Sequence, residues 1–159
     1  MARFVFFAAT ISCAFFFQCA DAHPSIPFEV KWQSTFGPSA PTRLVIKSSD
    51  QWLRFWEIMK IDQERFVHSP APSTDKAPEV DFSRYTLIVV GTGATSGGFG
   101  ISIQNIVESR HSIRVSVLEK KPGHNCAGAA VSISPFVVAS IPATSKKVTF
   151  EFTGTETTC

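Results

Sequence analysis

Hydrophobic and polar side chains alternate in several segments spread along this sequence, and this period of two residues restricts the fold more than any other feature. The alternation recurs in five segments: 28–32, 43–47, 99–103, 112–118 and 148–152. Such a pattern is typical of strands that bury one face. The segment 85–90 is almost entirely apolar, as in a strand that is buried on both faces. A further run at 131–141 is interrupted by Pro135, which indicates a bend or a sheet edge.

One segment changes to a helical period. Ser48 and Gln51 have the spacing of a capping box at the start of a helix. Four apolar residues then follow at spacings of three and four: Trp52, Phe55, Trp56 and Met59. The pattern predicts an amphipathic helix of about three turns. A pair of Trp side chains can form a binding platform, but aromatic residues at helical spacing more often pack on a sheet, so we interpret them as core.

These patterns predict a mainly β (α+β) fold, an antiparallel β-sheet or sandwich-like domain with one amphipathic helix packed on it. Short connections between the strands favour antiparallel neighbours. The 159 residues are enough for about one domain. Residues 61–80 include Pro70, Pro72 and Pro78 and follow no regular period, so we expect a long loop there.

The N-terminal segment has the organisation of a secretory signal peptide. Arg3 precedes an uncharged apolar run at 4–17, and residues 20–22 match a small-x-small cleavage site. The run is too short for a membrane span, which needs about 20 apolar residues. We therefore expect 1–22 to be a cleaved signal. Residues 23–159 would form a single secreted or periplasmic domain without an integral membrane segment.

Two alternatives stay open for this segment. Cys13 or Cys19 could anchor a lipoprotein, although the residues before each of them fit a lipidation motif poorly. The apolar run could also be retained as a buried N-terminal helix or an anchor. Mass spectrometry of the mature N-terminus distinguishes these outcomes.

After signal cleavage, two cysteines remain. Cys126 and Cys159 predict one disulfide in an oxidising compartment. The alternatives are two free thiols, or an intermolecular bond through Cys159. His124 stands two residues before Cys126, but two ligands without a second pair make a weak metal site, so we expect no metal.

The charge balance excludes some classes of partner. The chain has 15 basic and 13 acidic side chains, and its formal net charge is +2. That balance gives no electrostatic basis for binding nucleic acid or an anionic membrane surface. No cofactor motif is present, and we expect no cofactor.

The glycine-rich segment 91–100 follows an apolar strand and resembles enzyme motifs only superficially. A dinucleotide fingerprint would continue into a helix, whereas a period-two pattern follows here. The segment has no Lys, which excludes a phosphate-binding P-loop. Ser96 lies between Thr95 and Gly97, and no His stands in a recognisable base motif. We therefore interpret the segment as a tight loop between strands, and the protein as no enzyme.

A family resemblance is carried by three stretches of sequence. They are VDFSRYTLIVVG at 80–91, TSGGFGISI at 95–103 and SPFVVASIP at 134–142. Together they resemble the C-terminal domain of the PrcB family, and the likeness extends over about residues 48–150. The glycine-glycine-aromatic motif is the most specific part of it.

The resemblance implies a non-catalytic exported bacterial protein that binds and stabilises another exported protein, with a protease complex as the candidate partner. It supplies no catalytic residues. We expect the exposed glycine-rich loop to be the contact surface, because loops on a rigid sheet often carry function. Its predicted binding residues are Thr95, Ser96, Gly97, Gly98 and Phe99. The alternative is a secreted small-ligand or carbohydrate-binding protein, or a hydrolase, that uses the Gly91–Gly100 loop and the loop at 61–80. Loss of a measured activity on substitution of Ser96 or Asp81 by Ala would support it.

Overall fold

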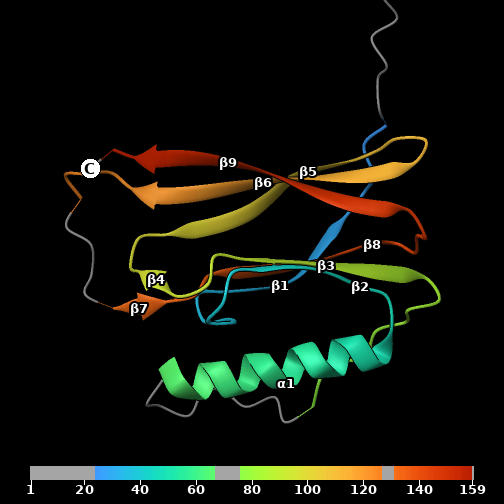
Figure 1. Ribbon diagram of the computed structural model, residues 1–159, viewed down its shortest axis with the longest axis horizontal. Helices are drawn as coiled ribbons and strands as arrows, with labels where there is room; N and C mark the ends of the chain where they lie inside the picture. Colours follow the sequence, from blue (N-terminus) through green and yellow to red (C-terminus); the bar gives the residue numbers. More distant parts are fainter. Residues whose placement is uncertain (1–23, 67–75, 127–130, 159) are drawn as a thin grey trace, which may run out of the picture.

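The fold has three layers, a helix, a four-stranded sheet and a three-stranded sheet, stacked in that order (Figure 1). The computed structural model describes residues 24–66, 76–126 and 131–158, so the predicted signal peptide lies outside the described residues. In chain order the elements are β1 (Glu29–Ser34), β2 (Thr42–Ile46), α1 (Ser49–Phe66), β3 (Tyr85–Gly91), β4 (Thr95–Ser96), β5 (Gly100–Glu108), β6 (Ser112–Pro122), β7 (Ser132–Ile133), β8 (Phe136–Pro142) and β9 (Lys147–Thr157). The predicted β-rich fold with one packed helix is confirmed.

The middle layer is an antiparallel sheet with the strand order β1-β8-β3-β2. Its central strands β3 and β8 pair from Tyr85 opposite Pro142 to Gly91 opposite Phe136. Nearly every residue of these two strands is buried, because the sheet is covered on both faces. The continuous apolar run at 85–90 is thereby explained.

The outer sheet has the order β5-β6-β9. The predicted hairpin is confirmed, since β5 and β6 pair antiparallel with a bulge between Ile103 and Asn105. The third strand differs from the expectation of antiparallel neighbours, because β9 pairs parallel to β6 along its whole length. The sheet is strongly twisted, and its strands cross one another in the view of Figure 1.

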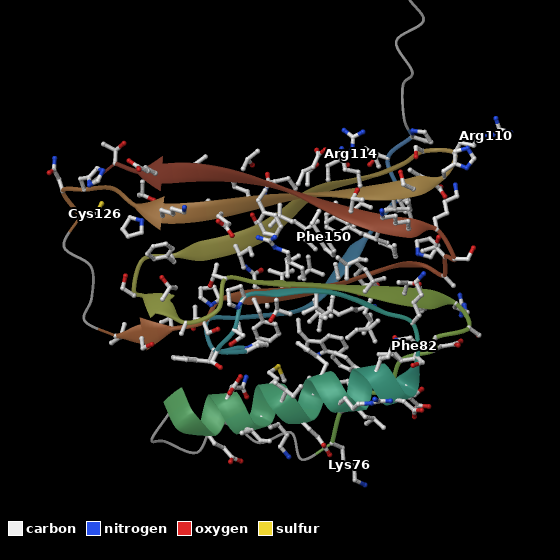
Figure 2. All side chains as sticks on the ribbon, viewed as in Figure 1. Lys76, Phe82, Arg110, Arg114, Cys126 and Phe150 are labelled. Carbon is white, nitrogen blue, oxygen red and sulfur yellow. The ribbon has the colours of Figure 1, made fainter. Side chains whose placement is uncertain are left out.

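Two hydrophobic cores lie on the two faces of the middle sheet. The core between the sheets is aliphatic and includes the fully buried Ile88, Val90, Ile106 and Val115. Phe150 of β9 packs against this core and is labelled between the two sheets in Figure 2. The core under the helix is aromatic, and its members include Trp52, Phe55, Trp56, Met59 and Phe136. The interpretation of the helical aromatics as core is therefore confirmed.

Helix α1 begins at the predicted capping residues, although the reciprocal bond of the capping box goes to Lys47 instead of the Ser48 amide, and the helix is longer than predicted. The Gln51 amide donates to the Ser48 hydroxyl at 3.4 Å, and the Gln51 side chain accepts from the Lys47 amide at 2.8 Å. The helix has 18 residues and ends at Phe66. Residues 61–66 therefore belong to the helix, and the expectation of a loop beginning at 61 is wrong.

A bulge in β1 changes which core its side chains reach. The alternation at 28–32 predicts one common face for Phe28 and Trp32. The pairing of β1 with β8 shifts between Val30 and Trp32. Because of this shift, Phe28 packs against the core between the sheets and Trp32 against the core under the helix.

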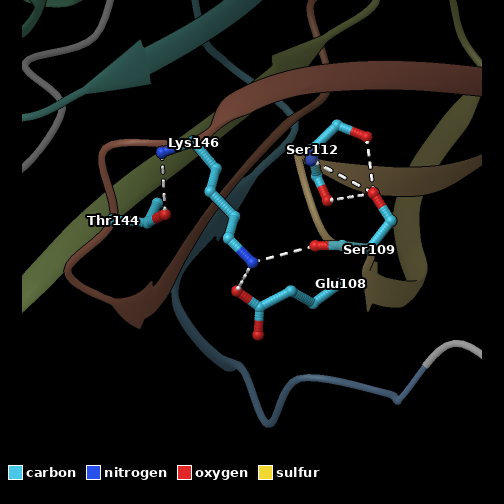
Figure 3. Close-up of polar contacts among 5 residues, drawn as sticks. All are labelled: Glu108, Ser109, Ser112, Thr144 and Lys146. Atoms are coloured by element: carbon cyan, nitrogen blue, oxygen red, sulfur yellow. Dashed lines mark hydrogen bonds and ion pairs between the residues drawn. The ribbon is translucent and has the colours of Figure 1, made fainter.

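The end of the domain at the β5–β6 turn is closed by a polar network (Figure 3). Lys146 Nζ lies 2.8 Å from Glu108 Oε1 and donates to the Ser109 carbonyl oxygen at 2.8 Å. The Ser109 hydroxyl in turn contacts the hydroxyl and the amide of Ser112. These bonds tie the connection between β8 and β9 to the hairpin turn.

Candidate functional site

The glycine-rich segment forms part of the end of the domain opposite the β5–β6 turn (Figure 1). It leaves β3 at Gly91 and contains the short strand β4, which pairs with β7. Thr95 lies opposite Ile133, and Ser96 lies opposite Ser132. The loop is therefore joined to the segment that leads into β8, 36 positions further along the chain.

Backbone hydrogen bonds hold this loop at two further points. The Thr92 amide donates to the Pro135 carbonyl at 3.0 Å, and the Ala94 amide donates to the Ser39 carbonyl at 2.8 Å. Between them, Gly93 has a φ of 75° and approaches the backbone of Pro41 closely. A Cβ atom on Gly93 would lie 2.7 Å from the Pro41 nitrogen, so only glycine fits this position.

The segment 35–41 is fastened to the helix and to the strand segment before β8. The Ser39 amide and hydroxyl both donate to Asp62 Oδ2 at 2.9 Å. The Gln63 side chain donates to the Phe36 carbonyl at 2.7 Å. The Ser134 hydroxyl donates to the Pro38 carbonyl. Three segments distant in sequence are thus bound into one unit, which we call the loop platform: residues 35–41, 92–99 and 131–135.

The loop platform contains no charged side chain. Its segments read TFGPSAP, TGATSGGF and VSISP, without Asp, Glu, Lys, Arg or His. Apart from Val131, its exposed residues are small: Thr35, Ala40, Pro41, Ala94, Ser96, Gly98 and Ser132. The result is a uniform surface of small polar and apolar groups held on a rigid backbone.

The structure places the predicted binding residues on this platform but does not expose all of them. Ser96 and Gly98 are exposed, Thr95 and Phe99 are half-buried, and Gly97 is buried. Their role in binding stays a prediction. Sequence analysis missed the segment 35–41 and the contribution of Ser132, because nothing in the local pattern shows that these residues meet the glycine-rich loop.

The two side chains considered for a hydrolase are far apart in the fold. Ser96 follows the C-terminal end of β3, whereas Asp81 precedes its N-terminal end. Asp81 Oδ1 accepts from the Ser83 hydroxyl at 2.5 Å and from the Ser83 amide at 3.0 Å. These bonds, with the nearby Arg84 charge, hold the pKa of the Asp81 carboxyl below its usual value. Asp81 therefore acts as a turn-forming residue ahead of β3.

Within residues 24–66, 76–126 and 131–158, no group of three or more His, Cys, Asp or Glu side chains is placed to hold a metal ion. No helix of the described part is long and apolar enough to span a membrane.

The surroundings of Cys126 bear on the predicted disulfide. Cys126 lies at the same end of the domain as β4 and β7 (Figure 2). Its Sγ is 3.4 Å from the carbonyl oxygen of Thr157, which also accepts from the Gly123 amide at 3.1 Å. Cys159 lies outside the described residues, so the pairing itself stays a prediction.

The family comparison covers the two central strands of the middle sheet, the β5–β6 hairpin and two platform segments. The model of the PrcB C-terminal family matches residues 86–142. This segment is therefore similar to the PrcB C-terminal family. The match is shorter than the resemblance over 48–150 and covers between a third and a half of the chain. It runs from β3 to β8 and includes 92–99 and 131–135. Neither a curated protein nor a solved structure gives a significant match to the chain.

Proposed function

We propose that this protein is an exported, non-catalytic accessory domain that binds another exported protein through the loop platform. The observation that carries the proposal is that the PrcB C-terminal segment supplies two of the three platform segments. The part of the chain that is similar to that family therefore builds most of this surface, and the segment 35–41 completes it. A protease complex is the candidate partner, from the resemblance of residues 80–142 to this family.

The chemistry of the loop platform supports a protein as the ligand. The centres of protein interfaces are depleted of charged residues, and the platform has none. Its loops are fastened by hydrogen bonds from Thr92, Ala94 and Ser39, so little loop entropy is lost on binding. Its exposed side chains are too small to hold a charged substrate but allow close approach of another backbone.

A charged side chain on the loop platform should abolish binding. Ser96→Arg places a long cation on the exposed face, where a bound partner would desolvate it. The matched control is Ser145→Arg, the same change at an exposed serine between β8 and β9 at the other end of the domain. Tagged wild type and both variants are recovered from the exported fraction, and bound proteins are quantified by mass spectrometry.

We expect wild type and Ser145→Arg to capture the same partner protein in similar amounts. Ser96→Arg should lower the affinity for that partner at least about tenfold, which corresponds to about 1.4 kcal/mol of binding free energy. Equal recovery with all three chains would contradict the assignment of the surface. A hydrolytic activity of the wild type that disappears in Ser96→Ala would contradict the non-catalytic role.

We also propose that export is followed by formation of a Cys126–Cys159 disulfide. The parallel pair of Pro122 with Thr157 brings the end of β6 beside the end of β9, and Cys159 follows Thr157 by two residues. Cys126 Sγ lies beside the Thr157 carbonyl, so the chain has to continue by only two residues to bring a second cysteine within the distance that a disulfide requires.

A peptide map of the exported chain without reductant should contain a Cys126–Cys159 linked peptide and an N-terminus at His23. The linked peptide should disappear in Cys159→Ser. Alkylation of both thiols in the unreduced protein, or a covalent dimer through Cys159, would contradict the internal bridge. A lipid-modified N-terminal Cys would contradict the cleavage site.

A further inference from the structure

The two edge strands of the outer sheet differ in whether another segment covers them. On the β5 edge, residues 24–26 cover part of the strand, because the Ile26 amide donates to the Ile106 carbonyl and the Glu108 amide donates to the Pro24 carbonyl. On the other edge, β9 is the last strand, and in the described part of the chain it pairs with β6 alone. One side of its backbone is therefore open.

The backbone groups on this open edge can be assigned from the ladder. In a parallel pair, alternate residues of a strand direct both N–H and C=O toward the neighbouring strand. The Thr157 carbonyl accepts from the Gly123 amide, so Thr157 faces β6. The pairing contains no register shift, so every odd-numbered residue of β9 faces β6. The residues that direct their backbone groups away from β6 are therefore Val148, Phe150, Phe152, Gly154 and Glu156.

The β9 edge lacks two of the usual protections of an edge strand. Natural edges are shielded by proline, by bulges or by charged side chains. The eleven residues KVTFEFTGTET contain no proline, and the strand has no bulge. Its charged side chains are Lys147 and Glu156 near the ends and Glu151, which pairs with Arg114. In the middle of the strand, Phe150 and Phe152 point toward the core between the sheets and are only half-buried. The edge thus combines open hydrogen-bonding groups with accessible aromatic surface.

We propose that β9 pairs antiparallel with β9 of a second copy of this chain, with the two-fold axis at Phe152. The open groups lie on even-numbered residues, so even-numbered residues must face one another across the axis. Among such registers, the one centred on Phe152 pairs all eleven residues, from Lys147 to Thr157. The two outer sheets then join into one continuous six-stranded sheet.

The side chains fit this register. Phe152 lies opposite Phe152 of the second copy, an aromatic cross-strand pair. Phe150 lies opposite Gly154 of the second copy, and a Cβ at Gly154 would meet no atom within 4 Å. An aromatic ring across from an edge glycine covers the exposed backbone there. Glu151 lies opposite Thr153 of the second copy and already pairs with Arg114 at 3.5 Å.

Substitution of Gly154 tests the open edge. Gly154→Pro removes an amide that faces away from β6, so the pairing with β6 is retained and only the new pairing loses a donor. Gly154→Ala is the matched control, since it also adds a Cβ but keeps the amide. Oligomeric state is followed by sedimentation velocity over a dilution series of the purified chain under reducing conditions, with circular dichroism as the check of folding.

We expect the wild type to form a dimer. The dissociation constant of the Gly154→Pro dimer should be at least about ten times that of the Gly154→Ala dimer. A wild type that is monomeric at its highest soluble concentration would overturn the proposal. Equal dissociation constants for the two variants would also overturn it.

A cross-linking experiment tests the register and does not depend on the folding of the proline variant. Thr149 and Thr155 of the second copy form a non-hydrogen-bonded pair in this register, with Cα atoms about 4.5 Å apart, which suits a disulfide. Within one chain these residues are roughly 20 Å apart along the strand. Thr149→Cys/Thr155→Cys should therefore form a covalent dimer on mild oxidation, above the background of wild type.

Thr149→Cys alone should form none. Cross-linking of this single variant would indicate the shorter register centred on Thr149, and the absence of cross-linking in the double variant would overturn the pairing.

Discussion

Phe136→Ala should lower the free energy of unfolding by about 3–5 kcal/mol, a large part of the stability of a domain of this size. Phe136 is the first residue of β8, is 3% exposed and belongs to the core under the helix. Its ring also fills the space beside Gly37, where a Cβ would lie 2.4 Å from the ring. The truncation therefore leaves a cavity between the helix and the loop platform.

The measurement for Phe136→Ala is urea unfolding, in which the midpoint should fall while the slope stays constant. The control is Phe82→Ala, which truncates a half-buried ring on the same core and should cost less. Equal losses in the two variants would contradict the larger contribution expected from the more deeply buried Phe136. Weaker partner binding by the folded variant would also be expected, because the platform rests on this ring.

Gly93→Ala should be destabilising by about 3 kcal/mol. The left-handed backbone at φ 75° costs a residue with a Cβ about 1–2 kcal/mol. The added Cβ would also lie 2.7 Å from the Pro41 nitrogen and 2.9 Å from the Ala40 carbonyl carbon. These are backbone atoms, which cannot rotate away as a side chain would, so the loops must separate.

The matched control for Gly93→Ala is Gly98→Ala. Gly98 also has a positive φ of 94°, but its added Cβ would lie 3.4 Å from Pro122 Cβ, an ordinary contact. Gly98→Ala should thus show the backbone cost of about 1–2 kcal/mol without the collision. Thermal and urea unfolding of both variants measure the difference. Equal losses would mean that the contact of the glycine-rich loop with 40–41 does not restrict the platform.

The loop platform and the β9 edge are separate surfaces with different chemistry. The platform is built from fastened loops with small uncharged side chains, and it suits a partner that approaches closely. The β9 edge presents a row of backbone donors and acceptors, and it suits another extended strand. Ser96→Arg and Gly154→Pro therefore separate the two interactions.

Local patterns were sufficient for the elements themselves. The apolar run at 85–90, the hairpin that covers 99–119 and the break at Pro135 all appear in the structure, because burial of a strand face depends directly on alternation. The start of α1 was likewise predictable, since Ser48 and Gln51 satisfy its free amides locally.

The end of α1 could not be predicted from the sequence, and the reason is physical. After Met59, the inward positions are Asp62 and Gln63, which look like loop residues in a sequence. Their side chains bond to Ser39 and to the Phe36 carbonyl, and these partners lie more than 20 residues away. When an inward-facing polar side chain forms its hydrogen bonds with a distant segment, the hydrophobic period of the helix stops in the sequence although the helix continues.

By itself, then, the sequence determined the longer strands, the position and start of the helix, and the buried face of most of these elements. Only the tertiary structure decided their neighbours: the parallel pairing of β9 with β6, the bulge that sends Phe28 and Trp32 to different cores, and the joining of 35–41 to the glycine-rich loop. Periodicity reports whether a side chain is buried, whereas pairing depends on backbone hydrogen bonds between distant segments, whose donors and acceptors are the same in nearly every residue.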